Sequence, residues 1–480
     1  MYSNTLLAQK ETGKCKPVDL RCEHLTRPLG IDRAKPRFSW HLEDERNGAK
    51  QLAYRITLGT DSAALARNKG VIWQEKKNSG QMLTTYKGKA LKPFTRYYWS
   101  VTVWDQDQQV SEQTISSFET GFMNTAQWKG SFVSDGKDIE SRETPYFRKE
   151  FVLKKKVKSA RAYIVAAGLY ELSLNGSKVG DHFLDPAFTD YGKRLLYVTY
   201  DVTQLLHEGE NAVGVILGNG WYNHQPVAEW NFHQAPWRNR PSFCLNIHVQ
   251  YADGTKDIIT SDRSFKVAAG PITFNAIYVA ENYDFRKDLP GWNTWAFDDS
   301  SWSPAVEVSC PCSNIVSQAM YPIRKTEFRK PVSLKKLSDT LYLYDFGQNW
   351  SGITEFRVQG QSGTKVKLHH GEQLDSRRKR IFDDNNTQFY QNVKEPLKYG
   401  VHPVDEIFAT DVLWLDGKVD TFAPRFNYKG FQYVEVSSDK PLELTKDNIT
   451  SYFVHTDVPV SGSFECSDSL VNRLWRATNY

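Results

Sequence analysis

The chain has 480 residues, of which 61 are lysine or arginine and 56 are aspartate or glutamate, and its net charge of +5 is spread along the sequence. No basic block is joined to a known nucleic-acid-binding module, no apolar run approaches the ~20 residues of a membrane span, and six cysteines are too few for a disulfide scaffold. These features argue against nucleic-acid-binding, membrane-spanning and disulfide-framework proteins, and the length leaves room for about three domains of ~150 residues.

Residues 17–123 form the first predicted domain. Apolar and polar residues alternate over residues 54–58, which is the period of a half-buried strand. Residues 91–101 have the pattern Leu-x-Pro-x-Thr-x-Tyr-Tyr-Trp-x-Val, which resembles the F-strand region of fibronectin type III domains. In those domains a tyrosine hydroxyl holds a corner of the chain to the backbone. We therefore expect a fibronectin type III or immunoglobulin-like β-sandwich.

Residues 145–322 form the second predicted domain, after a polar connector over residues 124–144. Short strands are predicted around residues 160–165 and 170–174, and the following Asn175-Gly176 pair favours a two-residue hairpin turn. The strand series closes with the run Gly-Asn-Gly-Trp-Tyr at residues 218–222. This pattern predicts a second antiparallel sandwich.

Residues 323–436 form the third predicted domain, and residues 341–374 are its most informative part. Thr354, Phe356 and Val358 alternate with polar residues, and glycines at positions such as 347 and 352 indicate places where the backbone turns or has positive φ. An antiparallel strand set is expected here. Residues 437–461, which include two prolines, are expected to form a linker.

Residues 462–480 change from the strand period to the helix period. Ser467 is the expected helix N-cap, and Asp468 suits the first turn of the helix. One apolar helical face then follows, made of Leu470, Val471, Leu474, Trp475 and Thr478. An amphipathic helix is expected, and we interpret it as an unfinished element that is cut off at Tyr480.

The motifs of the last three regions resemble bacterial α-L-rhamnosidases of glycoside hydrolase family 78. Asp-Phe-Gly-Gln-Asn at residues 345–349, Gly-Glu-x-Leu at 371–374 and the run at 422–436 are similar to their concanavalin-like domain, and residues 170–222 look like their N-terminal jelly-roll. The resemblance implies an all-β chain of tandem β-sandwiches: fibronectin III/Ig-like, jelly-roll and concanavalin-like. It also implies that residues 462–480 contain the first helix of a truncated (α/α)6 catalytic barrel.

No catalytic residue is predicted in this chain. Glycoside hydrolysis needs two carboxyl groups on either side of the scissile bond. The available acid pairs, Asp298/Asp299, Asp383/Asp384 and Glu372/Asp375, are explained more simply as turns and solvated edges. The resemblance places the catalytic acids on the helical barrel.

A carbohydrate-binding site is predicted at Asp190, Asn219, Trp221 and Tyr222. In some relatives the jelly-roll binds rhamnose with the help of calcium, and calcium prefers several hard oxygen ligands. Asp190 and Asn219 offer such oxygens, while Trp221 and Tyr222 offer apolar surface. The alternative is that Asp190 caps a turn, Asn219 has positive φ, and both rings belong to a core. No cofactor is required, and calcium is the one candidate.

The resemblance implies the N-terminal accessory region of an enzyme that removes terminal α-L-rhamnose from polysaccharides or glycosides with inversion. The fragment alone is expected to be inactive. A lectin-like protein that ends at Tyr480 and a structural multi-sandwich protein are the alternatives, and the oligomeric state is left open. Leu6-Leu7-Ala8-Gln9 fits the end of a trimmed signal peptide, so we expect a periplasmic or extracellular location. There, Cys15 and Cys22 could pair, whereas Cys310 and Cys312 lack a second pair for zinc.

Overall fold

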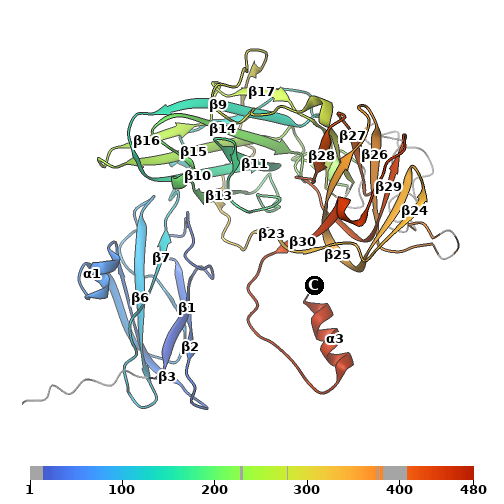
Figure 1. Ribbon diagram of the computed structural model, residues 1–480. Coiled ribbons are helices and arrows are strands. Elements are labelled where there is room, and N and C mark those ends of the chain that lie inside the picture. Colours follow the sequence, from blue (N-terminus) through green and yellow to red (C-terminus); the bar gives the residue numbers. More distant parts are fainter. Residues whose placement is uncertain are drawn as a thin grey trace, which may run out of the picture. The chain divides into compact units, whose positions relative to one another are not determined.

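The computed structural model describes residues 14–226, 231–277, 279–375, 377, 379–381 and 408–479 (Figure 1). The chain divides into two compact units. Residues 1–128 and 316–320 form the first unit, and residues 129–315 and 321–480 form the second. Both units are built mainly from strands, which confirms the predicted all-β class. Leu6–Gln9 lie outside the described residues, as does the acid pair Asp383/Asp384.

The first unit is a sandwich of two sheets with strand orders β1-β2-β5 and β4-β3-β6-β7. Its core includes Trp40, Ile56 and Trp99, which lie on strands of both sheets. The elements are β1 (Lys16–Cys22), β2 (Arg37–Glu43), β3 (Gln51–Gly59), α1 (Ser62–Ala66), β4 (Val71–Asn78), β5 (Leu83–Thr85), β6 (Arg96–Asp105) and β7 (Thr114–Glu119).

The predicted tyrosine corner is present in this sandwich. The hydroxyl of Tyr97 accepts a hydrogen bond of 2.8 Å from the backbone N–H of Lys92, so that the start of β6 is held to the preceding loop. Cys15 and Cys22 are both buried in the same core as free thiols.

The second unit begins with two sheets that enclose one core. One sheet has the order β21-β8-β15-β10-β13 with β16 beside β15, and the other has the order β12-β11-β14-β9-β17-β20. Fully buried side chains such as Ile164 on β10 and Val215 on β14 meet between them. The strands are β8 (Phe132–Ser134), β9 (Pro145–Leu153), β10 (Val157–Ala167), β11 (Leu169–Leu174), β12 (Ser177–Lys178), β13 (Leu195–Asp201), β14 (Gly209–Gly218), β15 (Ser242–Tyr251), β16 (Lys256–Thr260), β17 (Lys266–Ala269), β20 (Ser303–Pro304) and β21 (Val306–Val308). A further strand, β22 (Ile315–Ser317), spans the sequence boundary between the second unit and the first.

The predicted hairpin and the predicted connector have different outcomes. Asn175 and Gly176 have φ values of 49° and 84° and join the antiparallel strands β11 and β12, which confirms the hairpin. The connector over residues 124–144 is not wholly irregular, because β8 within it pairs with β15 and β21.

A ten-stranded sheet completes the second unit, in the order β18-β19-β27-β26-β29-β25-β30-β23, with β24 and β28 paired to β25. The strands are β18 (Ile272–Ala276), β19 (Ala280–Asp284), β23 (Ile323–Arg329), β24 (Ser333–Ser338), β25 (Leu341–Gln359), β26 (Lys365–Gly371), β27 (Thr410–Trp414), β28 (Val419–Phe422), β29 (Lys429–Ser438) and β30 (Ile449–Thr456).

Two strands of this sheet differ from the sequence-based expectation. Residues 449–456 were expected in a linker, but they form β30, which pairs with both β25 and β23. β19, from the region predicted as the jelly-roll, pairs in parallel with β27, with Asn282 opposite Val412. The second and third predicted regions therefore share one sheet.

β25 shows why its glycines are needed. The register with β29 shifts between Asp345 and Trp350, and Gly347 takes a φ of 74° within this bulge. A Cβ atom at Gly352 would collide with the carbonyl oxygen of Tyr452 on β30. The alternation predicted for Thr354, Phe356 and Val358 is confirmed, since all three side chains are buried.

The chain closes with α3 (Ser469–Thr478), the predicted amphipathic helix. Its N-cap is Asp468 rather than Ser467: the Asp468 carboxylate accepts hydrogen bonds from the backbone N–H groups of Leu470 and Val471. Leu470 and Leu474 on its apolar face are each 59% exposed. No helix in the described residues combines the length and apolar character needed to cross a bilayer.

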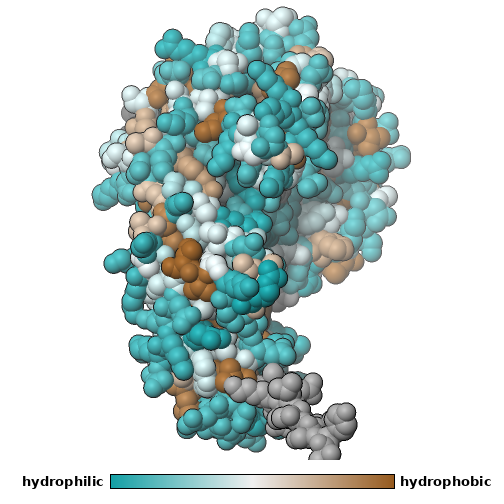
Figure 2. Space-filling view, turned by 90° about the vertical axis from the view of Figure 1, so that its left-hand side faces the viewer, coloured by the Kyte–Doolittle hydropathy of each residue, from teal (hydrophilic) through white to brown (hydrophobic). Residues whose placement is uncertain are grey.

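The surface is mainly hydrophilic on the face seen in Figure 2, where hydrophobic side chains form small separate groups. Scattered exposed apolar residues of this kind are normal for a soluble surface and do not by themselves indicate an interface.

Candidate functional site

Loops at one end of the jelly-roll strands enclose a pocket of about 320 Å³. They precede β13, follow β14, precede β15 and follow β21, so the wall is assembled from four distant parts of the sequence. The pocket is lined by Asp190, Tyr191, Gly192, Tyr222, Pro236, Trp237, Asn239 and Pro311. Two of the four predicted site residues, Asp190 and Tyr222, therefore lie in one pocket.

Asp190 organises the turn before β13. Its Oδ1 accepts a hydrogen bond of 3.1 Å from the Gly192 N–H, and its Oδ2 lies 3.0 Å from Nζ of Lys193. Its carbonyl oxygen accepts further bonds of 2.9 Å from the N–H groups of Lys193 and Arg194. Asp190 therefore caps a turn, as the alternative interpretation proposed. Its half-buried side chain also lines the pocket.

Three aromatic side chains also line the pocket. The rings of Tyr191 and Tyr222 meet edge to face at 5.1 Å, and burial raises the pKa of Tyr222 to about 12, so its hydroxyl stays protonated at neutral pH. Trp237 is half-buried, and its indole N–H donates to the carbonyl oxygen of Trp221 at 3.2 Å. This arrangement offers ring surface beside hydroxyl and carboxylate groups.

Trp221 lies outside this pocket in a neighbouring aromatic cluster. Its ring centroid is 4.8 Å from Phe232 and 6.2 Å from Phe188, which is 47% exposed. The core alternative fits Tyr222, which is buried, better than it fits the half-buried Trp221.

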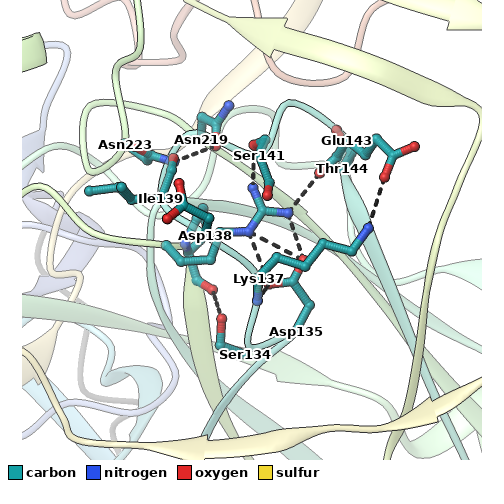
Figure 3. A network of polar contacts seen from close by, with 12 residues as sticks. Ser134, Asp135, Lys137, Asp138, Ile139, Ser141, Glu143, Thr144, Asn219 and Asn223 are labelled. Carbon is teal, nitrogen blue, oxygen red and sulfur yellow. Dashed lines mark hydrogen bonds and ion pairs between the residues drawn. The ribbon is translucent and has the colours of Figure 1, made fainter.

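Asn219 belongs to a separate polar network (Figure 3). Its backbone N–H donates to Oδ1 of Asn275 at 2.8 Å, its Nδ2 donates to the Asn275 carbonyl oxygen at 3.0 Å, and its Oδ1 accepts from Asn223 at 3.4 Å. The positive φ suggested for Asn219 belongs instead to Gly220, whose φ is 51°. Asn219 therefore anchors the loop that follows β14.

The calcium prediction has no support from this geometry. Calcium takes six to eight oxygen ligands, yet the Asp190 carboxylate is paired with Lys193 and the side-chain oxygen of Asn219 accepts a hydrogen bond from Asn223. Across the described residues, no group of three or more His, Cys, Asp or Glu side chains is arranged to hold a metal ion. We therefore assign no calcium ligands.

Sequence analysis did not identify Arg240, which directly follows the pocket-lining residue Asn239. Its guanidinium forms a two-point ion pair with Asp135, with bonds of 2.9 and 2.6 Å, and donates to the carbonyl oxygens of Ser141 and Glu143 at 2.7 Å. No local pattern connects residues 135 and 240, so only the folded chain brings them together.

His224 was also missed. Its ring is 1% exposed, and within the described part of the chain neither ring nitrogen has a hydrogen-bond partner. Burial lowers its pKa to about 3, so the imidazole is neutral at physiological pH. Its position directly after the Gly-Asn-Gly-Trp-Tyr-Asn run is the one sequence signal that could have identified it.

Family models match three consecutive parts of the chain. Residues 17–124 match a Rha78A-like N-terminal immunoglobulin domain, residues 155–327 match an α-L-rhamnosidase N-terminal domain, and residues 335–455 match a bacterial α-L-rhamnosidase concanavalin-like domain.

Curated relatives extend these matches across the chain. An α-L-rhamnosidase from Formosa agariphila is 33% identical over 93% of this chain and 48% of its own length. One from an Alteromonas species is 29% identical over 97% of this chain and 50% of its own length. The chain thus spans about half the length of these relatives.

Solved structures agree with the curated relatives. The α-L-rhamnosidase from Dictyoglumus thermophilum matches with a TM-score of 0.83 and 36% identity, over 95% of this chain and 51% of that one. The Streptomyces avermitilis α-L-rhamnosidase, crystallised with L-rhamnose, matches with a TM-score of 0.84 and 25% identity, over 96% of this chain and 59% of that one.

Proposed function

Because the chain belongs to the α-L-rhamnosidases of glycoside hydrolase family 78, whose N-terminal domains it carries, we propose that it serves an enzyme that removes terminal α-L-rhamnose from glycans or glycosides with inversion. The match to α-L-rhamnosidases over more than nine-tenths of the chain is the observation that carries this proposal. The substrate class comes from the printed activity of these relatives.

The role that we propose for this part of the enzyme is to hold the sugar rather than to cleave it. Inverting hydrolysis needs two carboxyl groups about 6.5–9.5 Å apart. The pocket is lined by a single carboxyl group, that of Asp190, and this group is already paired with Lys193. The chain alone is therefore expected to bind a rhamnoside without turning it over.

The chemistry of the pocket suits a deoxyhexose. The half-buried indole of Trp237 offers apolar surface for the C–H face and the methyl group of rhamnose, while Asp190 offers an acceptor for sugar hydroxyls. The described pocket, at about 320 Å³, lies at the lower end of the range for small-ligand sites.

Two measurements on the 480-residue chain test the proposal. Incubation with an aryl α-L-rhamnoside should release no aglycone above background. Titration calorimetry with L-rhamnose should give saturable heat, and D-glucose should give none. Repeating the titration with a chelator decides whether calcium takes part. Enzyme-like turnover by this chain would contradict the binding role, and an absence of heat would favour a structural role for these domains.

Variants locate the binding site. Trp237→Ala should weaken L-rhamnose binding about tenfold or more, because it removes the ring surface. Trp295→Ala is the matched control, since Trp295 is also half-buried but lines a different pocket. Asp190→Asn keeps an oxygen for the turn and removes the charge, so a selective loss of affinity would assign Asp190 to the sugar. Equal losses in the Trp237 and Trp295 variants would contradict this pocket.

We also propose a periplasmic or extracellular location, because polymeric glycans are met outside the cytoplasm. Cell fractionation with an antibody against this chain tests it. Recovery of the protein with cytoplasmic markers would contradict an exported enzyme.

A further inference from the structure

Two cysteines border the pocket and have no role in the proposed function. Cys310 and Cys312 lie on either side of Pro311, which lines the pocket together with Asp190 and Tyr222. Cys310 is exposed and Cys312 is half-exposed, and both are free thiols. Both residues therefore reach the surface, although burial raises the pKa of the Cys310 thiol and disfavours its thiolate.

The backbone already folds one thiol towards the other residue. The chain bends at Pro311, and Sγ of Cys310 lies 2.8 Å from the carbonyl oxygen of Cys312. A disulfide needs Cα atoms about 4.4–6.8 Å apart, and a bend shortens the distance between residues i and i+2 into that range. Sγ of Cys312 instead lies 3.7 Å from the carbonyl oxygen of Asn314, so this side chain has to rotate towards Cys310 before a disulfide can form.

We propose that Cys310 and Cys312 form a redox-sensitive dithiol, which a low-molecular-weight disulfide of the glutathione class closes to an intramolecular disulfide that reshapes the pocket. The part of this proposal that concerns sugar affinity rests on the proposed function. The part that concerns disulfide formation does not.

The exchange balances as two ordinary steps. One cysteine loses its proton and attacks the small disulfide, which forms a mixed disulfide and releases one small thiolate. The second cysteine thiolate then attacks the protein sulfur and displaces the other small thiolate, which takes up a proton. The protein loses two electrons and two protons, and the small disulfide is reduced to two thiols.

Closure acts on the pocket through Pro311. Joining the two sulfur atoms pulls residues 310 and 312 together, so the proline between them must shift relative to the other lining residues. A change at this dithiol therefore reaches the pocket wall at Pro311.

The dithiol itself is tested by mass and peptide mapping. After treatment with oxidised glutathione, the chain should lose two hydrogens in mass, and a proteolytic peptide should contain a Cys310–Cys312 link that dithiothreitol reopens. Cys310→Ser and Cys312→Ser should abolish this link. Cys466→Ser is the matched control, because Cys466 is a half-exposed free thiol outside the pocket. A Cys310–Cys244 link, or stable glutathione adducts alone, would overturn the proposal.

The effect on the pocket has two readouts. The first readout is the quenching of Trp237 fluorescence by acrylamide, obtained as the difference between the native chain and Trp237→Phe. This quenching should change when the native chain is oxidised, and it should not change when Cys312→Ser is treated in the same way. The dissociation constant for L-rhamnose should change about fivefold or more between the two redox states. If neither state binds L-rhamnose, the sugar role fails, and the quenching result still decides whether the pocket responds. Unchanged quenching in a chain with the mapped link would overturn the reshaping.

Discussion

Arg240, which follows the pocket-lining residue Asn239, forms a buried two-point ion pair with Asp135, although the two residues lie 105 positions apart in the sequence. Their side chains are 6% and 3% exposed. Because the remaining Arg240 donors bond to carbonyl oxygens of Ser141 and Glu143, this one side chain joins the loop before β9 to the start of β15.

The first prediction follows from this pair. Asp135→Asn should destabilise the chain by about 3–5 kcal/mol, because it leaves a buried guanidinium without its counter-charge. Chemical denaturation measures the free energy of unfolding. Lys336→Ala is the control, since its ion pair with Asp339 is exposed and should contribute less than ~1 kcal/mol. Equal effects of the two changes would contradict the structural role assigned to Arg240.

The second prediction concerns Glu281, which is fully buried on β19. Burial raises its pKa to about 7, although the N–H groups of Arg425 and Phe426 bond to its carboxylate and oppose the shift. The folded state therefore binds this proton more tightly than the unfolded state, whose glutamate has a pKa near 4.5. The stability contribution is fully present below pH ~4.5 and is lost as the pH rises to about 7.

Glu281→Gln should remove this part of the pH dependence, which amounts to about 3 kcal/mol for a shift of this size. Denaturation curves at several pH values between 4 and 8 measure the difference between the variant and the native chain. Glu443→Gln, at an exposed position, is the control. A difference that stays constant across this pH range would rule out Glu281 as its source.

The third prediction tests the close approach of two strands. Gly352→Ala should cost about 1–3 kcal/mol or more, because the added Cβ meets the backbone oxygen of Tyr452, which cannot move without disturbing β30. Gly462→Ala is the control, since a Cβ at that position would have no heavy atom within 4 Å. If Gly352→Ala and Gly462→Ala have the same free energy of unfolding, the close pairing of β25 with β30 at Gly352 is wrong.

The fourth prediction concerns the first unit. Tyr97→Phe removes the hydroxyl that accepts the Lys92 N–H and should cost about 1 kcal/mol in the free energy of unfolding. Tyr98→Phe, on the neighbouring half-buried residue, should have a smaller effect. Thermal unfolding of the two variants compares them directly, and the reverse order of stabilities would show that Tyr97 does not fix the corner.

Local patterns were sufficient wherever one short segment determines the structure. Asn175-Gly176 predicted the hairpin because both residues tolerate the positive φ that its turn requires, and the apolar period predicted α3. β30 was missed because Pro441 and Pro459 on either side suggested a linker, although Ile449 and Phe453 on the strand are buried in the sheet. Its pairing with β25 decides its structure, and pairing is not visible in the segment itself.

The pocket shows the same limit. Asp190 and Tyr222 lie in segments that resemble the family, which is why the sequence predicts them as site residues. In the structure both residues line the same pocket. Trp237 and Pro311 come from loops without a recognisable motif, and Arg240 supports the site through a partner that is remote in the sequence. These side chains are far apart in the sequence and come together only in the folded chain. No fixed spacing between them is therefore available for a prediction from sequence.

The parallel pairing of β19 with β27 has a consequence for how a chain of this kind can be divided. β19 belongs to a sheet whose other strands come mostly from later in the chain. The jelly-roll and the concanavalin-like region must therefore be inherited together for this sheet to be complete. A gene fusion joined at residue 322 would inherit a sheet with its edge strands missing. Exchange between family members should therefore preserve residues 129–315 and 321–456 as a single heritable block.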